Sequence, residues 1–197
     1  MGSLRTFIAV EIPHSIQTSI QQQVDELRGK IGNSPIRWIP VKNIHLTLKF
    51  LGNVSQTDVR IITGIIHTEA ESHSAFDITI GGLGSFPSSK RARVLFLGIQ
   101  APAALETLQR GIESACVKAG YRPETRPFSP HLTIGRVRRS ITASDQTKIH
   151  TTLGEFKIDS LGTARVDSVH LFKSELRPSG AVYTKLFTAQ LRNRGET

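Results

Sequence analysis

Two copies of a four-residue motif place histidine and threonine at a spacing suited to acid–base chemistry. The copies are His45-Leu-Thr-Leu48 and His131-Leu-Thr-Ile134, so each reads His, apolar, Thr, apolar. Successive side chains of a β-strand point to opposite faces. In a strand, the His and Thr of each copy therefore share one face and the aliphatic residues occupy the other. Two imidazoles that face one bound group can act as a general acid and a general base.

The two motifs also divide the chain. They start 86 residues apart, close to half of the 197 residues. Composition alone predicts two such copies by chance in about one chain in ten thousand. Each copy follows a helical pattern and a proline-bearing approach, and another helical pattern comes after it. The repeat predicts a single bilobal domain over residues 1–197 with an α+β fold, in which two mainly antiparallel sheets with flanking helices surround a central cleft.

Apolar periodicity supplies the elements that must hold the motifs. Helical spacing predicts helices over 15–31, 55–72, 102–119 and 144–153. Alternation predicts strands at both motifs and over 5–12, 76–80, 93–99, 156–161, 166–172 and 181–191. The first motif lies in a strand over 44–51, whose alternation places Leu46, Leu48 and Phe50 on the core side.

The charge of the chain favours a polyanionic partner. The formal net charge is +9, from 25 basic and 16 acidic residues, and nucleic acid is the first candidate for such a balance. Basic residues cluster at 90–93 and, just after the second motif, at Arg136, Arg138 and Arg139. No apolar run approaches the length needed to cross a bilayer, and the N-terminal apolar stretch is too short for a signal peptide. With a single cysteine and no internal disulfide, the chain is expected to be cytoplasmic.

The remaining reactive residues favour structural roles. Cys116 falls on the apolar stripe of a predicted helix, so it is interpreted as a core residue. A zinc site needs three or four clustered ligands, and one cysteine without a His-x-x-x-His pair does not supply them. His170 lies on a predicted strand, and either a structural position or a place at the cleft is open. The other histidines lack a matching partner and are expected to be structural; they are His14, His67, His73 and His150.

On these motifs the chain resembles the two-histidine (2H) phosphoesterase superfamily, whose mark is a pair of His-x-Thr/Ser-x motifs. Within it, the chain is similar to the RNA 2′,3′-cyclic phosphodiesterases, formerly called 2′-5′ RNA ligases. The matching stretches cover residues 5–13, 38–52, 128–136 and 174–183. The resemblance implies a bilobal α+β fold and hydrolysis of a 2′,3′-cyclic phosphate on RNA or a nucleotide, without metal or cofactor.

The resemblance also implies roles for single residues. His131 is expected to be the base on water and His45 the acid on the departing 3′ oxygen, although the symmetry of the motifs leaves the opposite division open. Thr47, Thr133 and Arg136 are expected to contact phosphate. Arg136 has the opposite strand parity to His131, so this role requires Gly135 to kink or bulge the strand, or the strand to end there.

Aromatic residues are candidates for stacking on the base, and Tyr183 in the C-terminal stretch is the preferred one. The others are Phe7, Phe50 and Phe128, with core packing expected for Phe50. The alternatives within the class are a 2′-5′ RNA ligase or a phosphodiesterase for another cyclic or 2′,5′-linked nucleotide. A third alternative is a non-catalytic RNA-binding module. A monomer with no membrane association is expected in each case.

Overall fold

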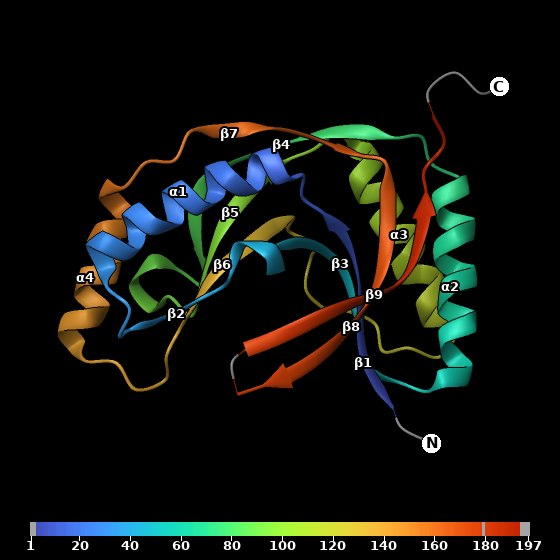
Figure 1. Cartoon of the computed structure of the whole chain (residues 1–197), viewed down its shortest axis with the longest axis horizontal. Coiled ribbons are helices and arrows are strands. Elements are labelled where there is room, and N and C mark those ends of the chain that lie inside the picture. Colours follow the sequence, from blue (N-terminus) through green and yellow to red (C-terminus); the bar gives the residue numbers. More distant parts are fainter. Residues whose placement is uncertain (1–2, 179, 194–197) are drawn as a thin grey trace.

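Nine strands form one curled sheet in the computed structural model, which describes residues 3–178 and 180–193 (Figure 1). Ser179, inside the last stretch of the family resemblance, is outside these residues. The strand order is β7-β4-β5-β6-β3-β1-β8-β9, with β2 paired to β6 off this path, and the pairings among described strands are antiparallel. The strands are β1 (Leu4–Glu11), β2 (Ile36–Trp38), β3 (His45–Val54), β4 (Phe76–Phe86), β5 (Val94–Gln100), β6 (His131–Val137), β7 (Ser160–Val166), β8 (Ser168–Arg177) and β9 (Gly180–Gln190).

The helices bury one face of this sheet and leave the other face for the cleft. They are α1 (His14–Ile31), α2 (Gln56–Glu71), α3 (Ala103–Lys118) and α4 (Ala143–Glu155), with short 3₁₀ turns η1 (Val41–Asn43) and η2 (Ser89–Arg91). Helices α1 and α4 back one half of the sheet, and α2 and α3 back the other (Figure 1). The apolar stripe predicted over 15–31 is buried along α1, so that helix prediction is confirmed.

The two halves meet at the motifs. The expected two sheets are joined edge to edge through β3 and β6, where the paired residues are Leu46 and Leu132. Both leucines are fully buried in the main core. A single paired position lets the two halves diverge on either side of the joint, which gives the bilobal form expected from the sequence.

One predicted strand is displaced. The alternation of Phe156 and Ile158 predicts a strand over 156–161, whereas β7 runs from Ser160 to Val166. Both side chains are buried in the core immediately after α4. The carbonyl oxygen of Ile158 accepts one hydrogen bond from the N–H of Gly82 in β4, but residues 156–159 form no regular strand. The alternating pattern therefore reflects a buried connecting segment and not a strand. The strand prediction is wrong for residues 156–159.

A buried ion pair ties the first motif strand to the approach to the second. Lys49 of β3 lies 2.8 Å from Glu113 of α3, and their side chains are 2% and 20% exposed. The ammonium also donates to the carbonyl oxygen of Arg122, and Glu113 accepts from the backbone N–H of Glu124. These bonds hold residues 122–124, which lead into His131, against the strand that carries His45.

We expect Glu113→Gln to lower the free energy of unfolding by about 3 kcal/mol, because it leaves the buried ammonium of Lys49 without its counter-charge. Urea denaturation followed by circular dichroism measures this. On the same helix, Glu106 pairs with Arg110 at 3.5 Å with both side chains about 70% exposed, so Glu106→Gln is a matched control. We expect the control to change stability by less than about 1 kcal/mol. Equal effects of the two substitutions would show that the Lys49–Glu113 pair does not hold the strand.

Candidate active site

The candidate site is centred on the Leu46–Leu132 joint. Antiparallel register continued by one residue places His45 across from Thr133, and Thr47 across from His131. All four side chains lie on the face opposite the buried leucines. The two histidines are diagonal neighbours on that face, a relation that puts Cβ atoms about 7 Å apart. The structure therefore brings the four motif residues together on one face of the sheet.

A β-bulge returns Arg136 to the same face. Thr133 of β6 pairs with Phe96 of β5, and Gly135 pairs with Leu95, the neighbour of Phe96. Two residues of β6 therefore advance against one of β5, and Ile134 is the extra residue. Ile134 and Gly135 are both buried, and Arg136 is exposed. The bulge thus provides the change of parity that the sequence requires. Glycine is needed at 135 because an added Cβ would lie 2.8 Å from Cγ2 of Ile36 in β2.

An equivalent bulge in β3 changes the interpretation of Phe50. Thr47 pairs with Ala9 and Lys49 pairs with Ile8, so Leu48 is the extra residue. Leu48 and Lys49 both turn inward, and Phe50 emerges 64% exposed. The expectation that Phe50 packs in the core is wrong, because strict alternation does not survive a bulge. Phe50 and Arg136 occupy corresponding positions in the two halves.

Both motif histidines are anchored through the same ring nitrogen. Nδ1 of His45 lies 2.8 Å from the carbonyl oxygen of Asn43, and Nδ1 of His131 lies 2.7 Å from that of Ser129. A carbonyl only accepts, so Nδ1 carries the hydrogen in each ring. Nε2 is therefore the nitrogen that can take or give a proton. Asn43 is itself held by donation of its side-chain amide to the carbonyl oxygen of Ala181.

Aromatic rings surround His45 and change its acidity. Phe7 stacks on the imidazole with centroids 4.6 Å apart, and Tyr183 meets it edge-on at 5.2 Å. Burial lowers the pKa of His45 to about 4; the Asn43 carbonyl opposes this and the positive charge of Arg136 adds to it. The free site thus favours a neutral imidazole at His45. His131 instead lies beside the stacked rings of Phe86 and Phe96 and meets both in edge geometry, with centroids 5.0 and 5.4 Å away.

Tyr183 connects this aromatic group to the basic side of the cleft. It packs against the small cluster formed by Phe7, Ala9 and Phe172 on the cleft face. Burial raises the pKa of its phenol, and the positive charges of three arginines oppose that rise: Arg136, Arg5 and Arg37. Tyr183 is therefore placed beside His45 and within electrostatic reach of Arg136, whereas Phe128 packs partly buried against the main core.

The other reactive residues have structural partners. His170 shares a row with Ala9 and Thr47 on the cleft face but is only 4% exposed. Its Nδ1 lies 3.0 Å from the Thr188 hydroxyl, and burial lowers its pKa while Glu11 opposes that. Cys116 is fully buried on α3, and burial raises the pKa of its thiol to about 11, so its assignment to the core is confirmed.

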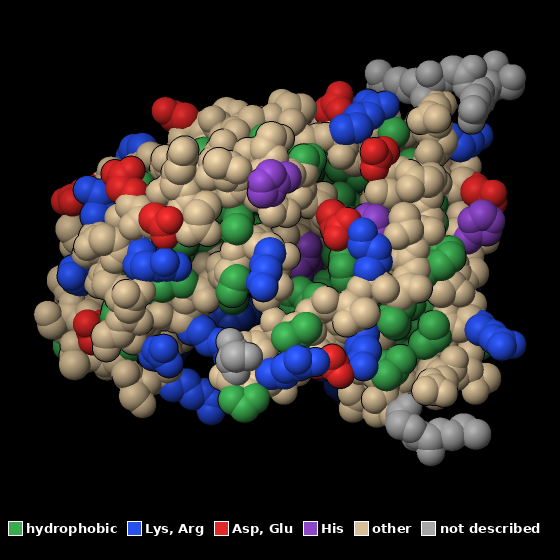
Figure 2. All heavy atoms as spheres, viewed as in Figure 1, with side chains coloured by type: hydrophobic (Ala, Val, Ile, Leu, Met, Phe, Trp, Pro, Cys, Tyr) green, Lys and Arg blue, Asp and Glu red, His purple; other side chains and the backbone are tan. Residues whose placement is uncertain are grey.

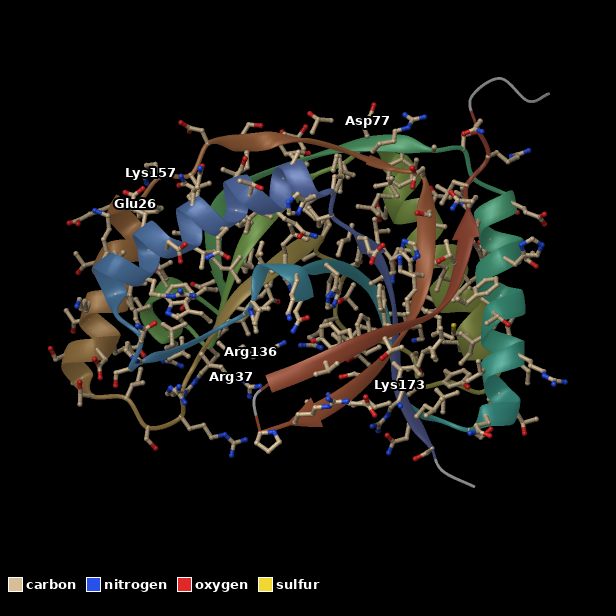
Figure 3. All side chains as sticks on the ribbon, in the orientation of Figure 1. Glu26, Arg37, Asp77, Arg136, Lys157 and Lys173 are labelled. Atoms are coloured by element: carbon tan, nitrogen blue, oxygen red, sulfur yellow. The ribbon has the colours of Figure 1, made fainter. Side chains whose placement is uncertain are left out.

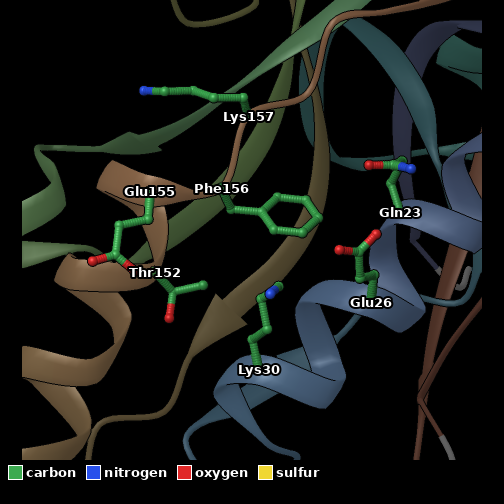
Figure 4. Close-up of a pocket in the computed structure, with 7 residues that line it drawn as sticks. All are labelled: Gln23, Glu26, Lys30, Thr152, Glu155, Phe156 and Lys157. Atoms are coloured by element: carbon green, nitrogen blue, oxygen red, sulfur yellow. The ribbon is translucent and has the colours of Figure 1, made fainter.

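Two cavities lie away from the joint or at its edge. One of about 470 Å³ opens between α1 and the end of α4 and contains none of the predicted site residues (Figure 4). Its carboxylates and ammonium groups are mixed. The other, of about 640 Å³, is lined by arginines and includes Arg136.

In the described part of the chain, no three His, Cys, Asp or Glu side chains gather as a metal site requires, and no helix is long and apolar enough to cross a membrane.

Comparisons of the sequence point to one family. A family model described as the 2′-5′ RNA ligase superfamily matches residues 16–177. A protein of Methanothermobacter thermautotrophicus named RNA 2′,3′-cyclic phosphodiesterase is 33% identical over 183 residues, which are 93% of this chain and 96% of that protein. A protein of Bacillus subtilis with the same name is 28% identical over 189 residues, covering 94% and 95% of the two chains.

Solved structures share the fold. Escherichia coli LigT complexed with 3′-AMP aligns with a TM-score of 0.73 and 26% identity, covering 96% of this chain and 98% of that one. The Thermus thermophilus protein TT0787 aligns with a TM-score of 0.79 over the same fractions. The predicted α+β, bilobal architecture is therefore confirmed.

We expect the imidazole of His45 to titrate near pH 4 in the free protein, and the substitution Arg136→Gln to raise that pKa by removing a nearby positive charge. Most of the lowering should remain, because burial is its largest cause. Histidine ¹H–¹⁵N NMR spectra recorded against pH measure this. Arg60→Gln, on the exposed side of α2, should leave the titration unchanged. Titration of His45 at its ordinary pKa of about 6.5 would contradict the packing described here.

Proposed function

Because the chain belongs to the 2′-5′ RNA ligase superfamily, we propose that it hydrolyses the 2′,3′-cyclic phosphate of RNA or a nucleotide to a 2′-phosphate. The observation that carries the proposal is the joint itself, where two His-x-Thr strands meet antiparallel with their polar residues on one face. Relatives named RNA 2′,3′-cyclic phosphodiesterase support the activity. The complex of Escherichia coli LigT with 3′-AMP supports a nucleotide as ligand.

In this mechanism, Nε2 of His131 takes a proton from water and the water oxygen attacks phosphorus. The bond between phosphorus and the 3′ oxygen breaks, and Nε2–H of His45 protonates that oxygen. The product carries a 2′-phosphate and a free 3′ hydroxyl. The hydroxyls of Thr47 and Thr133 and the guanidinium of Arg136 hydrogen-bond the non-bridging oxygens, where charge accumulates in the transition state.

The low pKa of His45 places a condition on this division of roles. His45 must carry a proton to act as the acid, and burial beside Arg136 disfavours that charge in the free protein. A bound phosphate brings a negative charge next to the ring and raises its pKa. Binding of the substrate therefore favours the protonated form of His45 that the acid role requires. Tyr183 packs on the His45 ring, and we infer that it contacts the bound nucleoside.

We further propose that the reaction needs neither metal nor cofactor and that the protein acts as a cytoplasmic monomer. Ligation through a 2′-5′ bond is the alternative for the same site, because the reverse reaction uses the same groups with exchanged roles. A module that binds RNA without catalysis is the alternative of a different class.

We expect the protein to convert 2′,3′-cyclic nucleotides to 2′-nucleotides in the presence of EDTA. His45→Ala and His131→Ala should each lower kcat at least about 100-fold, because each removes one partner of the proton transfer. Product isomers are identified by chromatography. His67→Ala, on the exposed side of α2, is the control and should keep full activity. Absence of turnover in EDTA, or full activity of either motif variant, would overturn the mechanism.

The pH dependence of kcat/KM reports the pKa values of the free enzyme. Because burial lowers the pKa of His45 to about 4, this pKa sets the acidic limb of the profile whether His45 is the acid or the base. Arg136→Gln lowers activity but raises the pKa of His45, so we expect the acidic limb to move to higher pH in this variant. An acidic limb that stays in place would show that His45 does not titrate in the reaction.

A further inference from the structure

We propose that Arg37, Arg93 and Arg139 form a second phosphate site beside Arg136, which binds the phosphodiester next to the terminal nucleotide of an RNA strand. The inference rests on the proposed function and specifies its substrate as an oligoribonucleotide rather than a mononucleotide. It starts from the arginine-lined cavity at the edge of the joint. That cavity, of about 640 Å³, is formed where β5 begins and β6 ends, and its lining includes Arg93, Arg136 and Arg139.

Arg37 and Arg136 are direct cross-strand neighbours in β2 and β6. Figure 3 shows the two labelled side by side, facing the β8–β9 hairpin. Like charges directly opposite each other in a sheet are destabilising. Both side chains are exposed, and an anion shared between them would turn this repulsion into attraction.

These arginines lack acidic partners in the described part of the chain. No described carboxylate lies within 4.0 Å of the guanidinium of Arg37, Arg93, Arg136 or Arg139. Several arginines elsewhere on the surface do have one; these are Arg28, Arg110, Arg126, Arg165 and Arg177. Other described arginines, among them Arg60 and Arg138, also lack one, so the cavity is distinguished by three unpaired arginines that line the same hollow.

Aspartate and glutamate are absent from the whole sequence segments that surround these arginines. Twelve of the 25 Lys and Arg residues, and none of the 16 acidic residues, fall in 27–57, 78–105 and 125–144. These segments contain β2, β3, β5 and β6, the strands on both sides of the joint. Figure 2 shows Lys and Arg side chains gathered around the hollow toward the lower left of that face. Such a field suits a ligand with repeated negative charge.

A polynucleotide fits this arrangement because its charges are spaced along a chain. The terminal phosphate lies at the joint and contacts Arg136, and the adjoining arginines continue away from it. The corresponding position in the other half of the cleft is the exposed Phe50, which offers a ring instead of a charge. The two bulges therefore make the cleft asymmetric, and the RNA strand leaves over the His131 half.

The test compares two substrates that share the same 2′,3′-cyclic end, a cyclic mononucleotide and a six-nucleotide RNA. We expect wild type to prefer the RNA. The ratio of kcat/KM for RNA to that for mononucleotide should fall roughly 10-fold in Arg93→Gln and in Arg139→Gln, because each loses a charge-assisted contact to phosphate. The slope of log kcat/KM against log salt should also become shallower by about 0.7 per lost contact. Arg60→Gln is the matched control and should keep both values.

Equal kcat/KM for the two substrates in wild type, or an unchanged ratio in both variants, would overturn the phosphate site. If neither substrate is turned over, the proposed function fails, and fluorescence anisotropy with a labelled six-nucleotide RNA ending in a 2′-phosphate tests the site separately. Salt-dependent binding that weakens in Arg93→Gln and Arg139→Gln would support it. Absence of binding, or equally tight binding of a labelled polyglutamate peptide, would overturn the assignment to RNA.

Discussion

The single antiparallel bridge between Leu46 and Leu132 is the constraint on which the rest of the structure depends. It buries two leucines at the centre of the core and forces their polar neighbours onto the opposite face. Because the strands are antiparallel, each histidine faces the threonine of the other motif. A cleft with alternating imidazoles and hydroxyls follows from this one contact. The buried Lys49–Glu113 pair then holds the approach to the second motif against the first strand.

The two β-bulges give the halves of the cleft different chemistry. Each inserts one residue after the threonine, so the fifth residue after each histidine returns to the cleft face. In the first half that residue is Phe50 and in the second it is Arg136. The bulges also move Lys49 and Gly135 inward, where one makes the ion pair and the other allows β2 to approach. The same backbone arrangement thus presents an aromatic ring in the first half of the cleft and a basic group in the second.

Much of the fold could be predicted from the sequence, because the spacing of apolar residues along a helix or strand shows which of its faces is buried. The stripe of α1, the motif strands and the core position of Cys116 all depend on local spacing. The bulge in β3 could not be predicted, since no residue type marks Leu48 as the extra one, and the assignment of Phe50 failed for that reason. The bulge in β6 could be anticipated at Gly135 only because the phosphate contact expected for Arg136 required a change of strand parity there. The like-charged pair of Arg37 and Arg136 depends on strand pairing across about 100 residues, which periodicity does not report.

The central claim is that one phosphate lies between the two imidazoles. The most direct measurement is a crystal structure of the protein soaked with a nucleoside 2′-monophosphate, the product of the proposed reaction. We predict the phosphate at the Leu46–Leu132 joint, with Nε2 of His45 and Nε2 of His131 each within about 3 Å of a different oxygen. A phosphate bound elsewhere, or in contact with only one of the two rings, would contradict the account.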